Sequence, residues 1–254
     1  MISFLGTTAS YLKPILSGCD RLCQQSLMAS LQNYVEREDE AAISKLLDDK
    51  ESRELIVKGL KQSPYSLLHH AAALRKDAAL RVMMKKLPLE VWNLRTKEDL
   101  QHTPPIVGGR TPIMFAAESN GCDIIVALRD AVECYIWDRE RGGRYGASGQ
   151  AALEELDALK AEFTCPFGVV SFAGIWLQII NAQDDQGDTP LLLAVKKDRL
   201  ESVRELLDLG GSAYIRNRLG QNAADLILAL PKGSPVRECF VKSTASLPSR
   251  CTIS

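Results

Sequence analysis

Apolar residues recur at helical spacing along most of the chain and predict short helices arranged in pairs. Ile113, Ala116 and Ala117 share one face of a first helix, and residues 124–128 supply the apolar face of a second helix. The same arrangement recurs over residues 191–207. Because each helix pair has an apolar face that it cannot bury alone, we expect neighbouring pairs to stack and to form an all-α fold.

The predicted helices carry boundary signals. Thr111 and Thr189 stand just before the first helix of a pair, where a threonine hydroxyl can accept a hydrogen bond from a backbone N–H group. Pro112 and Pro190 follow directly and suit the first helical turn. Gly210 follows the second helix of its pair, where a left-handed residue commonly ends a helix. These signals strengthen the prediction of paired helices.

An internal repeat runs through the chain, and its clearest unit begins near Asn181 and contains the sequence Gly-Asp-Thr-Pro-Leu from Gly187. A related segment follows at Gly220, 33 residues after Gly187. Segments at Gly109, Ser66 and Gly149 match the unit closely, fairly and weakly, in that order. The period of 33 residues and the Gly-x-Thr-Pro-Leu signal resemble the ankyrin repeat.

The resemblance to the ankyrin family implies an all-α fold, namely an ankyrin-repeat solenoid with a helical N-terminal cap and inserted loops. It implies about five degenerate repeats. The repeats would start near residues 64, 109, 149, 187 and 220. We expect three regions: a helical cap with a partial repeat over 1–60, degenerate repeats over 61–230 with an insertion around 136–150, and a flexible basic C-terminal tail over 231–254.

The N-terminal region has an apolar stripe of its own. Apolar residues between positions 12 and 35, including Cys19, Leu22 and Cys23, fall on one helical face and predict a helix that packs on the first repeat. Two cysteines four residues apart on a helix could bind a metal ion, but no histidine or second cysteine pair stands nearby. We interpret both thiols as buried core groups and predict no metal site.

Composition and charge exclude several functional classes. Hydrophobic residues make up 46% of the 254 positions and charged residues 25%, which is typical of a soluble globular protein. The net charge of −1 offers no basic field, so we expect no nucleic-acid partner. No apolar run reaches the length of about 18 residues that a membrane span needs. The seven scattered cysteines favour a cytoplasmic protein with reduced thiols over a disulfide framework.

The resemblance implies a non-enzymatic scaffold that binds a partner protein in a concave groove. In the family, the residue after the Leu-His position of each first helix points into this groove. The corresponding residues are His70, Phe115, Glu155, Leu193 and Leu226. Since three of these five residues are apolar, we expect the groove to hold an apolar or amphipathic segment of the partner. The alternative is that the insertion or the C-terminal tail folds back over Phe115 and Leu193.

The turns between repeats supply further candidate contacts, because such turns project from the edge of the groove in the ankyrin family. One turn is acidic and the next is basic. The candidate residues are Asp184, Asp185, Gln186 and Asp188 in the acidic turn, and Arg216 and Arg218 in the basic turn. We expect a monomer without a cofactor.

Histidines and cysteines leave an enzymatic alternative open. His69 occupies the Leu-His-x-Ala position of its repeat, where the resemblance implies hydrogen bonds to the backbone of a neighbouring loop. A cysteine-dependent enzyme would instead need a thiol close to His70 or His102, and nothing in the sequence positions such a pair. We therefore predict no catalytic residues.

Two short segments suggest other roles. Residues 87–100 resemble the start of an F-box, which would make the chain a ubiquitin-ligase adaptor, although we favour a long connection between repeats. The sequence Cys251-Thr252-Ile253-Ser254 loosely fits a prenylation motif. A lipid on Cys251 with a basic tail would give peripheral membrane association, and the alternative is an unmodified tail. Degenerate repeats with such a tail resemble bacterial effectors that act inside a eukaryotic host cell.

Overall fold

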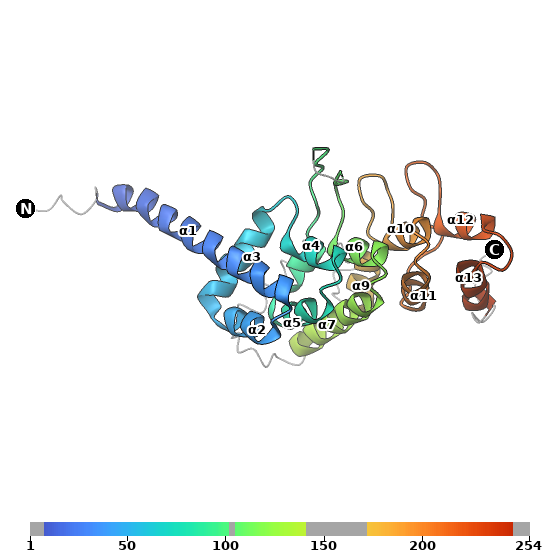
Figure 1. Ribbon diagram of the computed structural model, residues 1–254, viewed down its shortest axis with the longest axis horizontal. Coiled ribbons are helices and arrows are strands. Elements are labelled where there is room, and N and C mark those ends of the chain that lie inside the picture. Colours follow the sequence, from blue (N-terminus) through green and yellow to red (C-terminus); the bar gives the residue numbers. More distant parts are fainter. Residues whose placement is uncertain (1–7, 102–104, 141–171, 246–254) are drawn as a thin grey trace, which may run out of the picture.

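The computed structural model describes residues 8–101, 105–140 and 172–245, and its regular elements in these ranges are helices (Figure 1). The first part contains α1 (Thr8–Arg37), α2 (Glu40–Asp48) and α3 (Lys50–Gln62). The middle part contains α4 (Leu67–Ala73), α5 (Asp77–Lys86), the 3-10 helix η1 (Leu89–Asn93), α6 (Pro112–Glu118) and α7 (Cys122–Glu140). The last part contains α9 (Phe172–Ile180), α10 (Pro190–Lys196), α11 (Leu200–Asp208), α12 (Ala223–Ala229) and α13 (Pro235–Ala245). The predicted all-α fold is confirmed. Within the described residues, none of the helices combines the length and the apolar character that crossing a bilayer requires.

The helices form pairs that lie side by side along the molecule (Figure 1). The inner helices α4, α6, α10 and α12 contact one another in this order, and the outer helices α5, α7, α11 and α13 do the same. Small side chains allow the inner helices to approach closely, because Ala71, Ala116 and Ala194 are completely buried between them. Each pair thus covers the apolar face of the next, as the repeat pattern predicted.

The repeat predicted to start near residue 149 is not a separate layer of this stack. Residues 141–171, with the segment that begins at Gly149, lie outside the described residues, but α6 packs directly on α10 and α7 packs directly on α11. Among the described residues, no helix pair lies between α6 and α10 or between α7 and α11. Helix α9 instead packs beside α7, and the indole N–H of Trp176 donates to the Leu209 carbonyl oxygen at 2.8 Å. Within the insertion expected around 136–150, residues up to Glu140 belong to α7.

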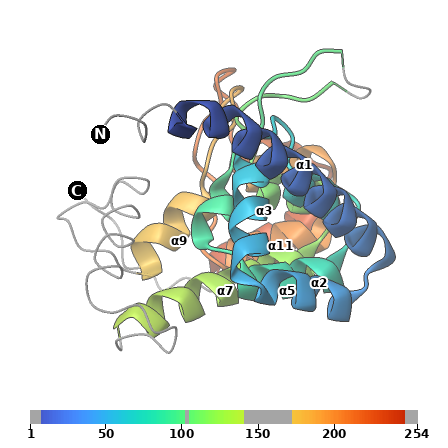
Figure 2. The same ribbon diagram turned by 90° about the vertical axis from the view of Figure 1, so that its left-hand side faces the viewer.

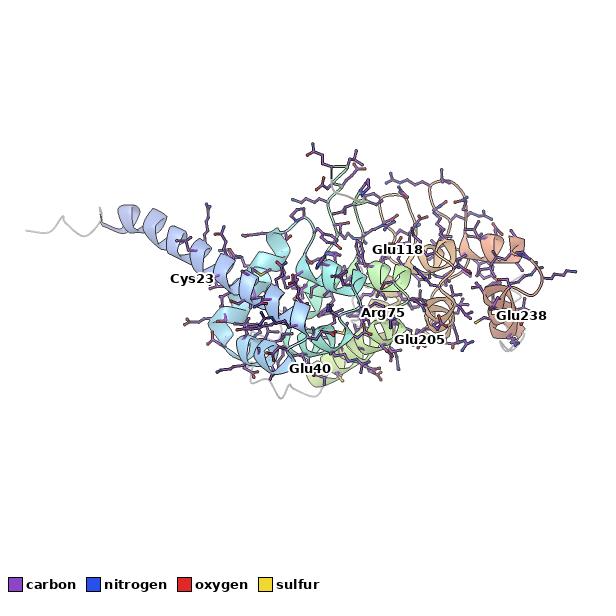
Figure 3. The ribbon with its side chains drawn as sticks, in the orientation of Figure 1. Cys23, Glu40, Arg75, Glu118, Glu205 and Glu238 are labelled. Atoms are coloured by element: carbon purple, nitrogen blue, oxygen red, sulfur yellow. The ribbon has the colours of Figure 1, made fainter. Side chains whose placement is uncertain are left out.

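Three helices form the N-terminal cap. Helix α1 packs on α2 and α3, and α2 packs on α5 of the first pair. Figure 2 views the molecule from this end, with α1 in front of the stack. Leu31 and Val35 of α1 are buried as predicted. The prediction is wrong for Leu22 and Cys23, whose side chains are exposed because α1 extends away from the stack toward its N-terminal end (Figure 3). The side chain of Cys19 is outside the description.

The C-terminal region is partly helical, so the expectation of a flexible tail over 231–254 is wrong for its first half. Val236 and Phe240 lie four residues apart on one face of α13, and both are buried where α13 packs on α11 and α12. The apolar area that they bury stabilises this helix on the stack. Residues 246–254 lie outside the described residues, so lipidation of Cys251 stays a prediction.

The predicted helix boundaries hold at Thr111, Thr189 and Gly210, but the hydrogen bond predicted for the Thr111 hydroxyl is absent. The Thr189 hydroxyl accepts a hydrogen bond from the Leu192 N–H at 3.2 Å, and Gly210 has a φ of +94°. Thr111 also precedes its helix, but its buried hydroxyl makes no hydrogen bond within the described residues. The reason is local: the N–H of Met114, which such a hydroxyl would bind, donates to the Thr111 carbonyl oxygen at 3.0 Å.

Candidate functional site

Three long connections project on one side of the stack and form fingers (Figure 1). The first finger comprises residues 94–110, the second residues 181–188 and the third residues 211–221. Neighbouring fingers are joined through their backbones. The Asp185 N–H donates to the Gly108 carbonyl oxygen, and the Arg218 N–H donates to the Gln186 carbonyl oxygen, both at 3.0 Å. The second finger is therefore held by the first, and the third finger is held by the second.

Glycine is required where one finger meets the next. Gly109 and Gly187 have φ values of +77° and +79°, in the left-handed region that glycine adopts without strain. A Cβ atom on Gly187 would lie 2.9 Å from the backbone nitrogen of Arg218. A Cβ atom on Gly109 would lie 2.8 Å from the backbone nitrogen of Asp185. The repeating glycine of the sequence is thus explained by both conformation and close backbone approach.

His69 holds the base of the first finger, and its predicted role is confirmed. Its Nδ1 accepts a hydrogen bond from the Ser66 N–H at 3.1 Å, so the Nε2 of the neutral ring carries the proton. Nε2 lies 2.9 Å from the Leu94 carbonyl oxygen and 3.1 Å from that of Arg110, at the two ends of the finger. Burial lowers the pKa of His69 to about 4, although the hydrogen bonds to these carbonyls raise it in part. The ring is therefore a neutral donor at physiological pH.

Arg110 joins the first finger, the second finger and α6. Its Nη1 donates to Oε2 of Glu118 at 2.9 Å, and its Nε donates to Oδ2 of Asp184 at 3.2 Å. The guanidinium carbon also lies 5.9 Å from the centre of the Phe115 ring, within the range of a cation–π contact. Glu118 lies on α6 beneath the fingers (Figure 3). Because the Asp184 side chain is completely buried, this network is shielded from solvent.

The acidic turn predicted from Asp184, Asp185, Gln186 and Asp188 is only half exposed. Asp184 and Asp188 are buried, which corrects the expectation that they offer charges to a partner. Asp184 Oδ1 accepts the N–H groups of Gln186 and Asp188 at 2.9 and 2.8 Å and so closes its own turn. Asp188 binds Lys196 at 2.6 Å and Asn217 of the third finger at 2.7 Å. Only Asp185 and Gln186 of this set face solvent.

The residues predicted to line the groove are partly or fully packed. Phe115 is half-buried and meets the rings of Tyr65 and His69 edge-on, with both centroid distances at 5.5 Å. His70 is half-buried and meets the Tyr65 ring edge-on at 6.2 Å. Leu226 is half-buried against the core. Glu155 lies outside the described residues. These contacts leave little apolar surface for a partner along this row.

Leu193 is a core residue, which corrects its assignment to an open groove. Its side chain is 3% exposed and packs with Met114 and Ala182 in a small apolar cluster. Leu193 is covered by Met114 of the preceding inner helix and by Ala182 of the second finger. This packing differs from the alternative in which the insertion or the C-terminal tail folds back over Leu193. Sequence periodicity could not reveal it, because the spacing shows which helix face is apolar but not how closely the next finger lies on it.

Replacing Leu193 with alanine is expected to lower the free energy of unfolding by about 2–3 kcal/mol, through lost apolar burial and the cavity that remains. The measurement is urea unfolding followed by circular dichroism. Leu177→Ala on α9 is the matched control, because Leu177 is exposed and its truncation should change stability by less than about 0.5 kcal/mol. Equal stability of the Leu193 variant and the native chain would contradict the core assignment.

The fingers carry exposed apolar side chains that the repeat pattern did not predict as binding residues. Leu100 of the first finger is 72% exposed, and Tyr214 and Leu219 of the third finger are 69% and 79% exposed. The basic residues Arg216 and Arg218 are exposed as predicted, and Arg216 pairs with Asp225 at 3.2 Å. A large apolar residue in a turn, such as Leu219 directly before Gly220, was the sequence signal that could have indicated these exposed side chains.

The alternative roles gain no support from the described residues. In the F-box-like segment 87–100, Leu87, Leu89, Val91 and Trp92 are buried in the core and are not accessible to a ligase subunit. Cys122 is half-buried and Cys134 is exposed, and His102 lies outside the description. No group of three or more His, Cys, Asp or Glu residues that could hold a metal ion is found among the described residues.

Comparison with known proteins agrees with the repeat pattern. The family model of the ankyrin repeat matches residues 186–218, which span the end of the second finger, α10, α11 and most of the third finger. Residues 186–218 are therefore an ankyrin repeat. No significant match to the chain is found among curated proteins.

Proposed function

We propose that the chain is a non-enzymatic interaction module that binds a partner protein across its fingers. The ankyrin repeat supports a role in protein–protein interaction. The observation that carries the proposal is the exposure of Leu100, Tyr214 and Leu219 on the fingers. Large apolar side chains exposed on the projecting loops of a scaffold are typical of a protein interface.

The charged side chains at the bases of the fingers support a binding surface on the outer parts of the fingers, because these charges are already paired within the chain. Arg110 is paired with Asp184 and Glu118, and Asp188 is paired with Lys196. A partner that used these charges would have to break ion pairs with buried members, at a cost of several kcal/mol. Recognition therefore falls on the outer parts of the fingers. The finer expectations of a cytoplasmic monomer and of an effector in a host cell stay predictions.

The test is a triple variant that changes Leu100, Tyr214 and Leu219 to alanine. We expect capture of the partner protein from cell extract, quantified by mass spectrometry, to fall by about tenfold or more, because truncation of central aromatic and apolar contacts costs about 1–2 kcal/mol each. Thermal unfolding should stay nearly unchanged, since all three side chains are exposed.

The matched control changes three exposed leucines that lie away from the fingers, namely Leu22, Leu74 and Leu177. This control variant should capture the partner as well as the native chain does. Equal capture by the finger variant and the native chain would refute the proposal, and so would an equal loss in both variants.

A further inference from the structure

The backbone pairing between fingers stops at the third finger. Gly108 and Gln186 stand directly before the repeating glycine of their fingers, and each carbonyl oxygen accepts an N–H group from the next finger. Leu219 occupies the same position before Gly220. Within the described residues, the Leu219 carbonyl oxygen accepts no hydrogen bond. The third finger thus has the same carbonyl acceptor as the other two fingers, but no following finger donates an N–H group to it.

The space beside this carbonyl is open. Gly220 has a φ of +75°, close to the values of Gly109 and Gly187, so the third finger has the same local conformation. A Cβ atom on Gly187 would meet the backbone of Asn217 and Arg218 within 3.2 Å, whereas a Cβ atom on Gly220 would find nothing within 4 Å. The third finger therefore has the same edge as the first two fingers. On the first two fingers the backbone of the next finger covers this edge, and on the third finger the edge is open.

Charge indicates what this edge can bind. Residues 211–242 contain five basic and two acidic side chains and so carry a net charge of +3. Residues 181–210, the layer before them, contain four basic and seven acidic side chains and so carry −3. Arg218 stands beside Leu219 and is exposed, and the exposed Tyr214 and Leu219 supply apolar surface on the same finger.

We propose that the open edge of the third finger binds an extended acidic segment of a partner protein, whose backbone N–H donates to the Leu219 carbonyl oxygen. This inference rests on the proposed function and names the partner's chemistry. The chain itself contains the precedent for this backbone pairing, because the Asp185 N–H donates to the Gly108 carbonyl oxygen and the Arg218 N–H donates to the Gln186 carbonyl oxygen. Addition of an extended segment to such an edge is a common mode of peptide recognition.

Other occupants fit the charge less well. A second copy of the chain would bring its own third finger, and the exposed Arg218 side chains of the two copies would repel each other. The acidic second finger of a second copy is already held between the first and third fingers. Residues 246–254 contain Arg250 and no Asp or Glu residue. We test an acidic segment of a different protein as the occupant.

The probe is a fluorescein-labelled peptide with the sequence of residues 181–188, Asn-Ala-Gln-Asp-Asp-Gln-Gly-Asp, added to the full chain. Binding is measured by fluorescence anisotropy and located by backbone amide chemical shifts. We expect the shifts to gather at Leu219, Gly220 and Tyr214. Arg218→Glu should raise the dissociation constant about tenfold, the equivalent of about 1.4 kcal/mol. A peptide with asparagine at all three aspartate positions should bind more weakly, and added salt should weaken the acidic peptide.

The matched control is Lys97→Glu, which makes the same charge change on an exposed residue of the first finger. It should leave the dissociation constant unchanged. The proposal is overturned if the two variants weaken binding equally, if the shifts appear on the first finger, or if no binding occurs. It is also overturned if sedimentation shows that two copies of the chain associate and that Arg218→Glu prevents this association. If the peptide fails while the triple finger variant still loses its partner, the proposed function stands and only the acidic-segment inference falls.

Discussion

Replacing Arg110 with alanine should lower the free energy of unfolding by about 3–5 kcal/mol, because it leaves the Asp184 carboxylate buried and without its charged partner. The same change removes the hydrogen bond to Glu118 and the contact with the Phe115 ring. Chemical denaturation at neutral pH measures the loss. We expect this to be among the most severe single substitutions in the chain.

A double-mutant cycle with Asp184→Asn separates the ion pair from the other contacts of Arg110. The double variant should be more stable than the sum of the two single effects predicts, since the uncompensated charge is then absent. Arg216→Ala is the matched control, because the Arg216–Asp225 pair is exposed and should contribute less than about 1 kcal/mol. Additive effects at Arg110 and Asp184 would contradict the coupling that the 3.2 Å contact implies.

Stability should fall by about 3 kcal/mol through His69 alone as the pH drops from about 6.5 to about 4. Burial holds the pKa of His69 at about 4 in the folded chain, against 6.5 for an ordinary histidine. Between these values the unfolded chain binds a proton that the folded chain does not bind, so acid favours unfolding. Above pH 6.5 the contribution is fully present.

The comparison that isolates this effect uses His69→Gln, whose amide does not titrate. The variant should be less stable than the native chain at neutral pH, because the contacts with the Leu94 and Arg110 carbonyls are altered. This difference should shrink as the pH falls through the window, since carboxylate titrations common to both proteins cancel. Urea unfolding at a series of pH values measures it, and a constant difference would show that His69 titrates normally.

Much of the fold could be predicted from short-range patterns. The spacing of Ile113, Ala116 and Ala117 predicted an inner helix with a small-residue face, and the repeated glycine at 187 and 220 predicted the period of the stack. The role of His69 also followed from its place in the repeat. These features depend on neighbours within a few residues or on the repeat itself, so one sequence contains enough information for them.

The candidate site was predicted less well, because exposure depends on what the next layer covers. Asp184 and Asp188 have the sequence of a solvated acidic turn, yet neighbouring repeats bury both carboxylates against Arg110, Lys196 and Asn217. Leu193 looked like a groove residue for the same reason. The direct packing of α6 on α10 likewise removed a layer that the weak motif at residue 149 had predicted.

The amino-acid sequence by itself determined the helix pairs, their boundaries and the left-handed glycines, since these are set by local sterics, capping and apolar periodicity. Only the tertiary structure decided which polar side chains are buried, which layers touch and where the finger pairing stops. Those properties arise from contacts between residues far apart in the chain, such as the hydrogen bond from Asp185 to Gly108 and the unfilled acceptor at Leu219. The physical reason is that burial belongs to the assembled stack and not to any single repeat.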